Sequence, residues 1–126
     1  MVKQLVLVAL GGGIGSALRY LSSWWLLKQF SYTFPLGTFI VNITGCLIVG
    51  FLMGLSIRYR ILTDELKFLL IVGFCGGYTT FSTFSSESIE LFKTGHYWIL
   101  TFYIAGSILF GLMAVWSGNV LSRIGT

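Results

Sequence analysis

Four apolar segments fill most of this chain, and each is long enough to cross a lipid bilayer. They run roughly over residues 5–30, 36–57, 66–92 and 97–121 of a 126-residue sequence. A helix needs about 20 mostly apolar residues to span the hydrocarbon. We therefore predict an all-α integral membrane protein with four transmembrane helices, forming a single domain over residues 1–126.

The composition supports this class. Hydrophobic residues make up 56% of the chain and charged residues only 10%, with a mean hydropathy of +0.88. The joints between segments hold the only proline, Pro35, a charged stretch at 58–65 and a glycine turn at Gly95. The opening residues 1–17 could also pass for a signal peptide, but the apolar run resumes after Arg19, which favours an uncleaved first helix.

The cationic residues are scattered and lie mostly near the ends of apolar runs. This argues against a nucleic-acid surface, which would cluster them, and favours snorkelling or topology-setting charges. Five would lie on one membrane face and two on the other, a weak bias that favours cytoplasmic termini. They are Lys3, Arg58, Arg60, Lys67 and Arg123 against Lys28 and Lys93.

Small residues recur in the segments at helical spacing. Gly11 with Gly15 and Gly50 with Gly54 both have the GxxxG spacing that lets helices approach closely. Four short helices hold too little protein to enclose a conduction path alone, so we expect a homo-oligomer. Cys46, Cys75 and His96 lack metal-ligand spacing, and we interpret them as structural.

The third segment contains the stretch GFCGGYTTFSTFSSE, residues 73–87, which is unusually polar for a membrane helix. Seven of the ten residues from Thr79 to Ser88 are Ser or Thr, directly after Gly76 and Gly77. Adjacent glycines weaken helix hydrogen bonding, and an interruption is tolerated only where the freed groups meet protein, ions or water. We predict a helix broken at mid-membrane, with carbonyls between Gly76 and Thr79 forming a cation site. The alternative is that the hydroxyls only cap and join helices.

Other polar and aromatic residues could contact an anion. Phe81 and Phe84 share a helical face, and their rings present positive edges. Asn42 lies near the middle of the second segment, where an amide is costly unless it has a partner. The remaining candidates are Arg19, Tyr103 and Ser107.

Acidic residues are scarce, which weighs against a proton-coupled exporter. None occurs before Asp64, and those within the third segment, Glu87 and Glu90, lie close to its end. Such an exporter normally needs an intramembrane carboxylate.

The motifs GGxIGSALRY, GTFIVNITG and GFCGGYTTFSTFSSE resemble the Fluc (CrcB) family of bacterial fluoride channels over nearly the whole chain. The resemblance implies an antiparallel, dual-topology homodimer of four-helix subunits with two fluoride pores and a central structural sodium ion. By this resemblance, Gly76 and Thr79 hold sodium through backbone carbonyls, while Arg19 and Glu87 lie in the vestibules. Pore residues implied by the resemblance are Phe81, Phe84, Asn42, Ser82, Thr83, Ser85, Tyr103 and Ser107. Tyr78 stands where relatives often have a smaller or aliphatic residue.

We therefore expect a passive fluoride channel of the bacterial inner membrane that exports fluoride and confers fluoride resistance. The sequence shows no activated nucleophile, metal-ligand cluster or nucleotide loop, so we do not expect an enzyme. A small proton-coupled multidrug-type exporter and a structural subunit of a larger membrane protein are the alternatives.

Overall fold

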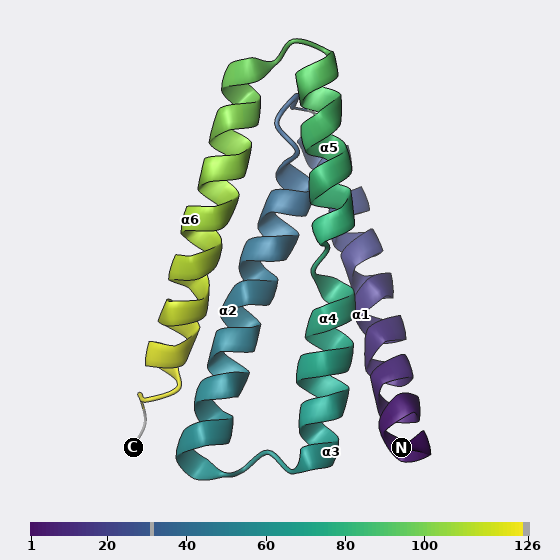
Figure 1. Cartoon of the computed structure of the whole chain (residues 1–126), viewed down its shortest axis with the longest axis vertical. Coiled ribbons are helices and arrows are strands. Elements are labelled where there is room, and N and C mark those ends of the chain that lie inside the picture. The colour runs from purple at the N-terminus through teal and green to yellow at the C-terminus, as the bar shows by residue number, and fades with distance from the viewer. Residues whose placement is uncertain (31, 125–126) are drawn as a thin grey trace.

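All regular secondary structure is helical within residues 1–30 and 32–124, which are the residues that the computed structural model describes. Its elements are α1 (Val2–Gln29), α2 (Leu36–Tyr59), α3 (Asp64–Lys67), the π-helical segment η1 (Phe68–Cys75), α4 (Gly76–Tyr78), α5 (Phe81–Lys93) and α6 (Tyr97–Leu121), as Figure 1 shows.

These elements form four segments long and apolar enough to cross a membrane. They are Val2–Gln29, Leu36–Tyr59, Asp64–Lys93 and Tyr97–Leu121, the third being built from α3, η1, α4 and α5. The prediction of an all-α chain with four membrane-capable helices is confirmed, and each predicted segment lies within a few residues of its helix.

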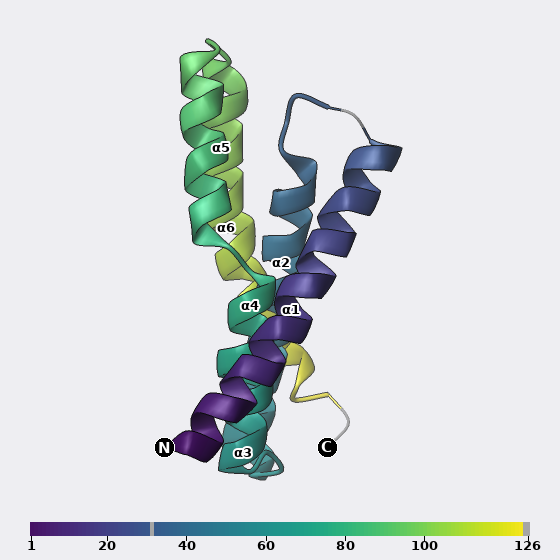
Figure 2. The same ribbon diagram turned by 90° about the vertical axis from the view of Figure 1, so that its right-hand side faces the viewer.

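The helices form two closely packed groups. Helix α2 packs most extensively on α6, and α1 packs on η1 and α4. Figure 2 shows α1 crossing the third segment obliquely, while α5 leans away from it towards α6. The N-terminus, the end of α6 and the α2–α3 loop lie at one end of the molecule, and the α1–α2 and α5–α6 connections lie at the other (Figure 1).

The glycines of the predicted GxxxG pairs lie at these helix contacts. A Cβ on Gly11 would overlap the Leu69 carbonyl oxygen, and one on Gly15 would overlap that of Phe74. Between α2 and α6, a Cβ on Gly50 would overlap the carbonyl oxygen of Val115. The prediction that this spacing marks close helix packing is confirmed, and here the packing is within one chain.

The third segment is interrupted after the two glycines and not at them. Gly76 is helical, with φ −62° and ψ −36°, and α4 continues to Tyr78. Thr79 and Thr80 are extended, with ψ values of 156° and 117°, before α5 begins at Phe81. The prediction that the glycines break the helix is wrong.

Packing explains the glycine at position 77, whereas a Cβ on Gly76 would meet nothing within 4 Å among the described residues. A Cβ on Gly77 would overlap the Gly12 carbonyl oxygen, so Gly77 allows α4 to touch α1. The extended conformation falls instead on two threonines, whose branched Cβ atoms favour it.

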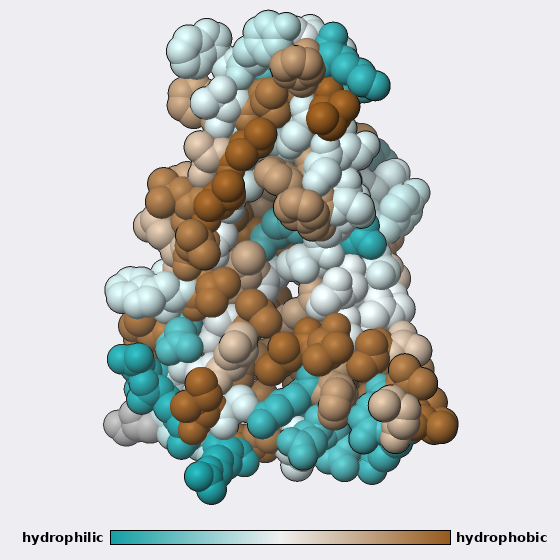
Figure 3. Space-filling model, in the orientation of Figure 1, coloured by the Kyte–Doolittle hydropathy of each residue, from teal (hydrophilic) through white to brown (hydrophobic). Residues whose placement is uncertain are grey.

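Few side chains are fully buried, as expected of a chain whose apolar surface meets lipid. Only Val41 and Tyr103 are large side chains with less than 2% of their surface exposed within the described residues. Hydrophilic side chains gather at the end that carries α3 (Figure 3). There Lys3 Nζ lies 3.2 Å from Glu65 Oε1 and ties α1 to α3.

Candidate functional site

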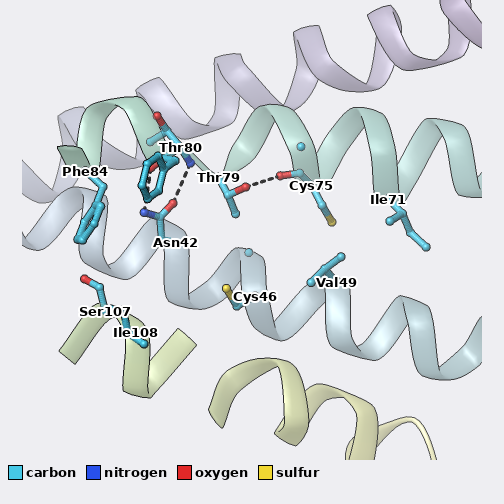
Figure 4. A pocket seen from close by; sticks show the side chains of 13 residues that line it. Asn42, Cys46, Val49, Ile71, Cys75, Thr79, Thr80, Phe84, Ser107 and Ile108 are labelled. Atoms are coloured by element: carbon cyan, nitrogen blue, oxygen red, sulfur yellow. Dashed lines mark hydrogen bonds between the residues drawn. The ribbon is translucent and has the colours of Figure 1, made fainter. Parts of the chain in front are cut away.

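A groove of about 430 Å³ runs along α2 beside the interruption of the third segment. It brings together six predicted site residues: Asn42, Gly76, Thr79, Phe81, Phe84 and Ser107. Figure 4 shows Asn42, Phe84 and Ser107 at one end of the groove, with Cys46, Val49 and Ile71 along the rest. Residues from three membrane-capable segments therefore meet at one place.

The amide of Asn42 pairs with the backbone of the interruption. Thr80 N–H donates to Asn42 Oδ1 at 2.9 Å, and Asn42 Nδ2 donates to the Thr80 carbonyl at 3.1 Å (Figure 4). Both backbone groups of one extended residue thus gain partners that a helix would otherwise provide. Asn42 is an anchor for the interruption as well as a residue of the groove.

Threonine hydroxyls stabilise both sides of the interruption. Thr79 Oγ1 donates to the Cys75 carbonyl at 2.9 Å, at the end of the preceding helix. Thr80 is the N-cap of α5 and accepts from Thr83 N–H at 3.2 Å. The Thr80 hydroxyl also lies 3.1 Å from Thr83 Oγ1 and 3.3 Å from Ser82 Oγ. These hydroxyls therefore cap helix ends, which was the alternative to an ion site.

The carbonyls near the interruption differ in their partners. The Gly77 carbonyl accepts from Arg19 Nε at 3.1 Å and from Ser16 Oγ at 3.4 Å. Within residues 1–30 and 32–124, no hydrogen bond reaches the carbonyls of Gly76 or Thr79, and both residues line the groove. These are the two residues predicted to hold a cation.

Aromatic rings form a continuous row at the start of α5. The Phe81 and Phe84 centroids are 5.8 Å apart, and the Phe84 and Tyr103 centroids are 5.0 Å apart. Phe81 is 78% exposed, whereas Tyr103 has no exposed surface. The row thus leads from the open groove into the interior of the chain.

Tyr103 and Glu87 are linked to each other. Tyr103 Oη donates to Glu87 Oε1 at 3.2 Å. Glu87 lines a second groove of about 300 Å³, together with Thr38 and the connection between α1 and α2. Arg19 instead lies against α4, so the two predicted vestibule residues are in different surroundings.

Ser107 is the unpaired hydroxyl of the site. Its Oγ is buried, has no hydrogen-bond partner among residues 1–30 and 32–124, and lies on α6 among the residues that line the groove. Ser82, Thr83, Ser85 and Tyr103 do not line the groove in this chain.

Sequence reasoning missed Thr80 and Tyr78. Thr80 is the residue that Asn42 holds, and Tyr78 contacts Thr44 on α2 at 3.2 Å. A threonine before a helical run is a typical N-cap, so the role of Thr80 had a signal in the sequence. The Tyr78 contact joins residues 34 positions apart and had none.

Fold and site together define a small multi-pass membrane protein whose groove is lined by neutral side chains, most of them apolar. The chain belongs to the CrcB-like protein family: the family model described as CrcB-like protein, Camphor Resistance (CrcB), matches residues 6–119. The resemblance seen in the sequence motifs is confirmed.

Similar proteins from several bacteria carry one name. The chain is 44% identical to a protein of Flavobacterium psychrophilum over 122 residues, 97% of this chain and 98% of that one. It is 46% identical to a protein of Bacteroides fragilis over 125 residues, covering 97% and 98%. It is also 46% identical to one of Phocaeicola vulgatus over 122 residues, covering 97% and 100%. Each is named a fluoride-specific ion channel, FluC. Because these relatives are ion channels, the expectation that the chain is not an enzyme is confirmed.

Proposed function

We propose that this chain is a fluoride-selective channel that exports fluoride passively across the bacterial cytoplasmic membrane. The observation that carries the proposal is the groove, where Phe81, Phe84, Asn42 and Ser107 meet. Relatives of nearly equal length that are named fluoride-specific ion channels support the same function.

The chemistry of the groove suits a small anion. Fluoride holds its water tightly, so a pore has to replace that water with several converging donors. The buried hydroxyl of Ser107 has no partner in the part of the chain that the structure describes, and ring edges of Phe81 and Phe84 carry partial positive charge. A fixed positive charge among these groups would trap the ion, and no described residue that lines the groove carries one.

The membrane potential supplies the driving force. A potential of 100 mV contributes about 2.3 kcal/mol per elementary charge, and a negative cytoplasm expels an anion. Uncharged HF enters the cell, dissociates and leaves as fluoride. Export of this kind gives fluoride resistance without coupling to another ion.

The active form in this proposal is an antiparallel, dual-topology homodimer. The groove is open, and Phe81 is 78% exposed beside it, so a second copy would complete the wall of the pore. The bias of cationic residues between the two membrane faces is weak, five against two, which is compatible with insertion in both orientations. The interruption at Thr79 and Thr80 falls near the midpoint of Asp64–Lys93, which supports a break at mid-membrane.

A structural sodium ion fits the carbonyls of Gly76 and Thr79. Carbonyls of unwound membrane helices are ligands that transport proteins use for sodium. These two carbonyls have no donor among the described residues, and two copies of the chain would present four. The ion would fix the two interruptions relative to each other and would not travel with fluoride.

Arg19 and Glu87 complete the proposed path as vestibule residues. Arg19 is anchored by its Nε to the Gly77 carbonyl, and its positive charge attracts anions towards the interruption. Glu87 accepts from Tyr103 and connects that row of rings to the second groove. Ser82, Thr83, Ser85 and Tyr103 remain proposed pore residues that do not line the groove of a single copy.

Liposomes that contain only this protein test the function. We expect fluoride efflux, followed with a fluoride electrode after a potassium ionophore is added, and far slower efflux of chloride from matched liposomes. Absence of fluoride efflux from liposomes that contain the dimer would contradict the proposal and favour a structural subunit.

A further inference from the structure

Tyr78 is the last residue of α4 and directly precedes the interruption. Its hydroxyl lies 3.2 Å from Thr44 Oγ1 on α2. This is a side-chain hydrogen bond between α2 and α4, separate from the Asn42 pair that holds Thr80.

The direction of the Tyr78 hydrogen bond follows from the other contacts of Thr44. Thr44 Oγ1 lies 2.8 Å from the Ile40 carbonyl and 3.0 Å from the Val41 carbonyl, to which it can only donate. A hydroxyl has one proton, so Thr44 uses its proton on its own helix. Tyr78 is therefore the donor and Thr44 the acceptor.

The Tyr78 ring also packs against Phe74 and against α2 near Gly45. It stacks on Phe74 with centroids 5.8 Å apart and planes at 7°. A Cβ on Gly45 would lie 3.2 Å from Tyr78 Cδ2 and would overlap Thr79 Cγ2. Helix α2 thus touches Tyr78 and Thr79 at the same level, so the Tyr78 hydroxyl sets how the end of α4 sits on α2.

We infer that Tyr78 is a positioning residue for the Thr79 carbonyl, acting through its hydrogen bond to Thr44. The inference rests on the proposed function, in which that carbonyl binds sodium. The Tyr78 side chain itself does not touch the ion.

The test measures fluoride efflux from liposomes as sodium is varied, with the same sodium concentration on both sides. In Tyr78→Phe, we expect the half-activating sodium concentration to rise about three- to tenfold, the worth of one hydrogen bond, with normal flux at saturating sodium. Tyr20→Phe is the control, since Tyr20 is 69% exposed on α1.

Variants of Thr44 test whether the effect of Tyr78 is carried by the hydrogen bond between the two residues. Thr44→Val should shift the half-activating concentration further than Tyr78→Phe, because it strands the Tyr78 hydroxyl in apolar surroundings. The double variant should return to the value of Tyr78→Phe, and Thr44→Ser should behave as wild type. Thr101→Val is the control, since Thr101 donates to the Tyr97 carbonyl at an exposed position.

The outcomes separate this inference from the proposed function. A sodium-dependent wild type with an unchanged half-activating concentration in Tyr78→Phe overturns the inference alone, even if maximal flux falls. A wild type whose flux does not respond to sodium overturns the proposed sodium site and the inference together, while fluoride flux itself remains a test of the channel.

Discussion

Asn42 shows how one side chain can sustain a backbone that has left the helix. Its amide supplies both a donor and an acceptor to Thr80. Sequence reasoning selected Asn42 because an amide in an apolar segment needs a partner. It could not identify the partner, because the pair joins residues 38 positions apart.

Replacing Asn42 with Ala should destabilise the folded protein. Two backbone groups of Thr80 would lose their partners, at a cost of about 1–3 kcal/mol for each group that stays buried. Thermal unfolding in detergent, followed by circular dichroism, measures the loss. Asn119→Ala, near the end of α6, is the matched control; an equal loss in both variants would contradict the special role of Asn42.

The rings of Phe81 and Phe84 allow packing to be separated from ion contact. Replacing either with Ile keeps apolar bulk but removes the positive ring edge. Because Phe81 is 78% exposed, Phe81→Ile should cost little stability in the single chain. We expect fluoride efflux from liposomes to collapse in both variants while the dimer elutes normally on size exclusion.

Normal efflux in both Phe variants would show that the rings only pack. Phe81 and Phe84 were correctly predicted to be neighbours from their three-residue spacing alone, because residues at that spacing lie on one face of a helix. The contact of Phe84 with Tyr103 needed the third and fourth segments to be placed side by side.

At the scale of the helices, close packing depends on which face each glycine occupies. A Cβ on Gly15 would overlap the Phe74 carbonyl oxygen, whereas one on Gly13 meets nothing within 4 Å. We expect Gly15→Ala to lower the yield of monodisperse protein sharply. Gly13→Ala should be neutral or stabilising by up to about 1 kcal/mol, since alanine favours helix.

Equal behaviour of the Gly13 and Gly15 variants would contradict the packing of α1 on η1.

Helix positions were predictable from the apolar runs because the bilayer thickness fixes their length. The place of the interruption was not, since Gly76 is itself helical and Gly77 serves the packing of α4 on α1. Hydrogen bonds from Asn42, which is distant in the sequence, hold Thr80 in the extended conformation.

The orientation of the whole chain can be tested by labelling. The variant is His96→Cys in a background in which Cys46 and Cys75 are replaced by Ser. Its single cysteine lies in the exposed α5–α6 turn, and Lys93 is unchanged. Dual topology predicts that an impermeant maleimide modifies about half of the molecules in intact cells and the rest after permeabilisation. Modification of all molecules in intact cells, or of none until the cells are permeabilised, would contradict dual topology.

A single chain cannot reveal its own partner, which is why the dimer stays a proposal from the open groove and the weak charge bias. Passive conduction of fluoride is the claim on which the rest depends. The most direct measurement is the reversal potential of the reconstituted protein in a planar bilayer, with fluoride gradients imposed at equal pH and equal sodium. A passive fluoride channel predicts a reversal potential equal to the Nernst potential of fluoride, unchanged when a pH or sodium gradient is added. A reversal potential that moves with either added gradient, or no fluoride current at all, would contradict it.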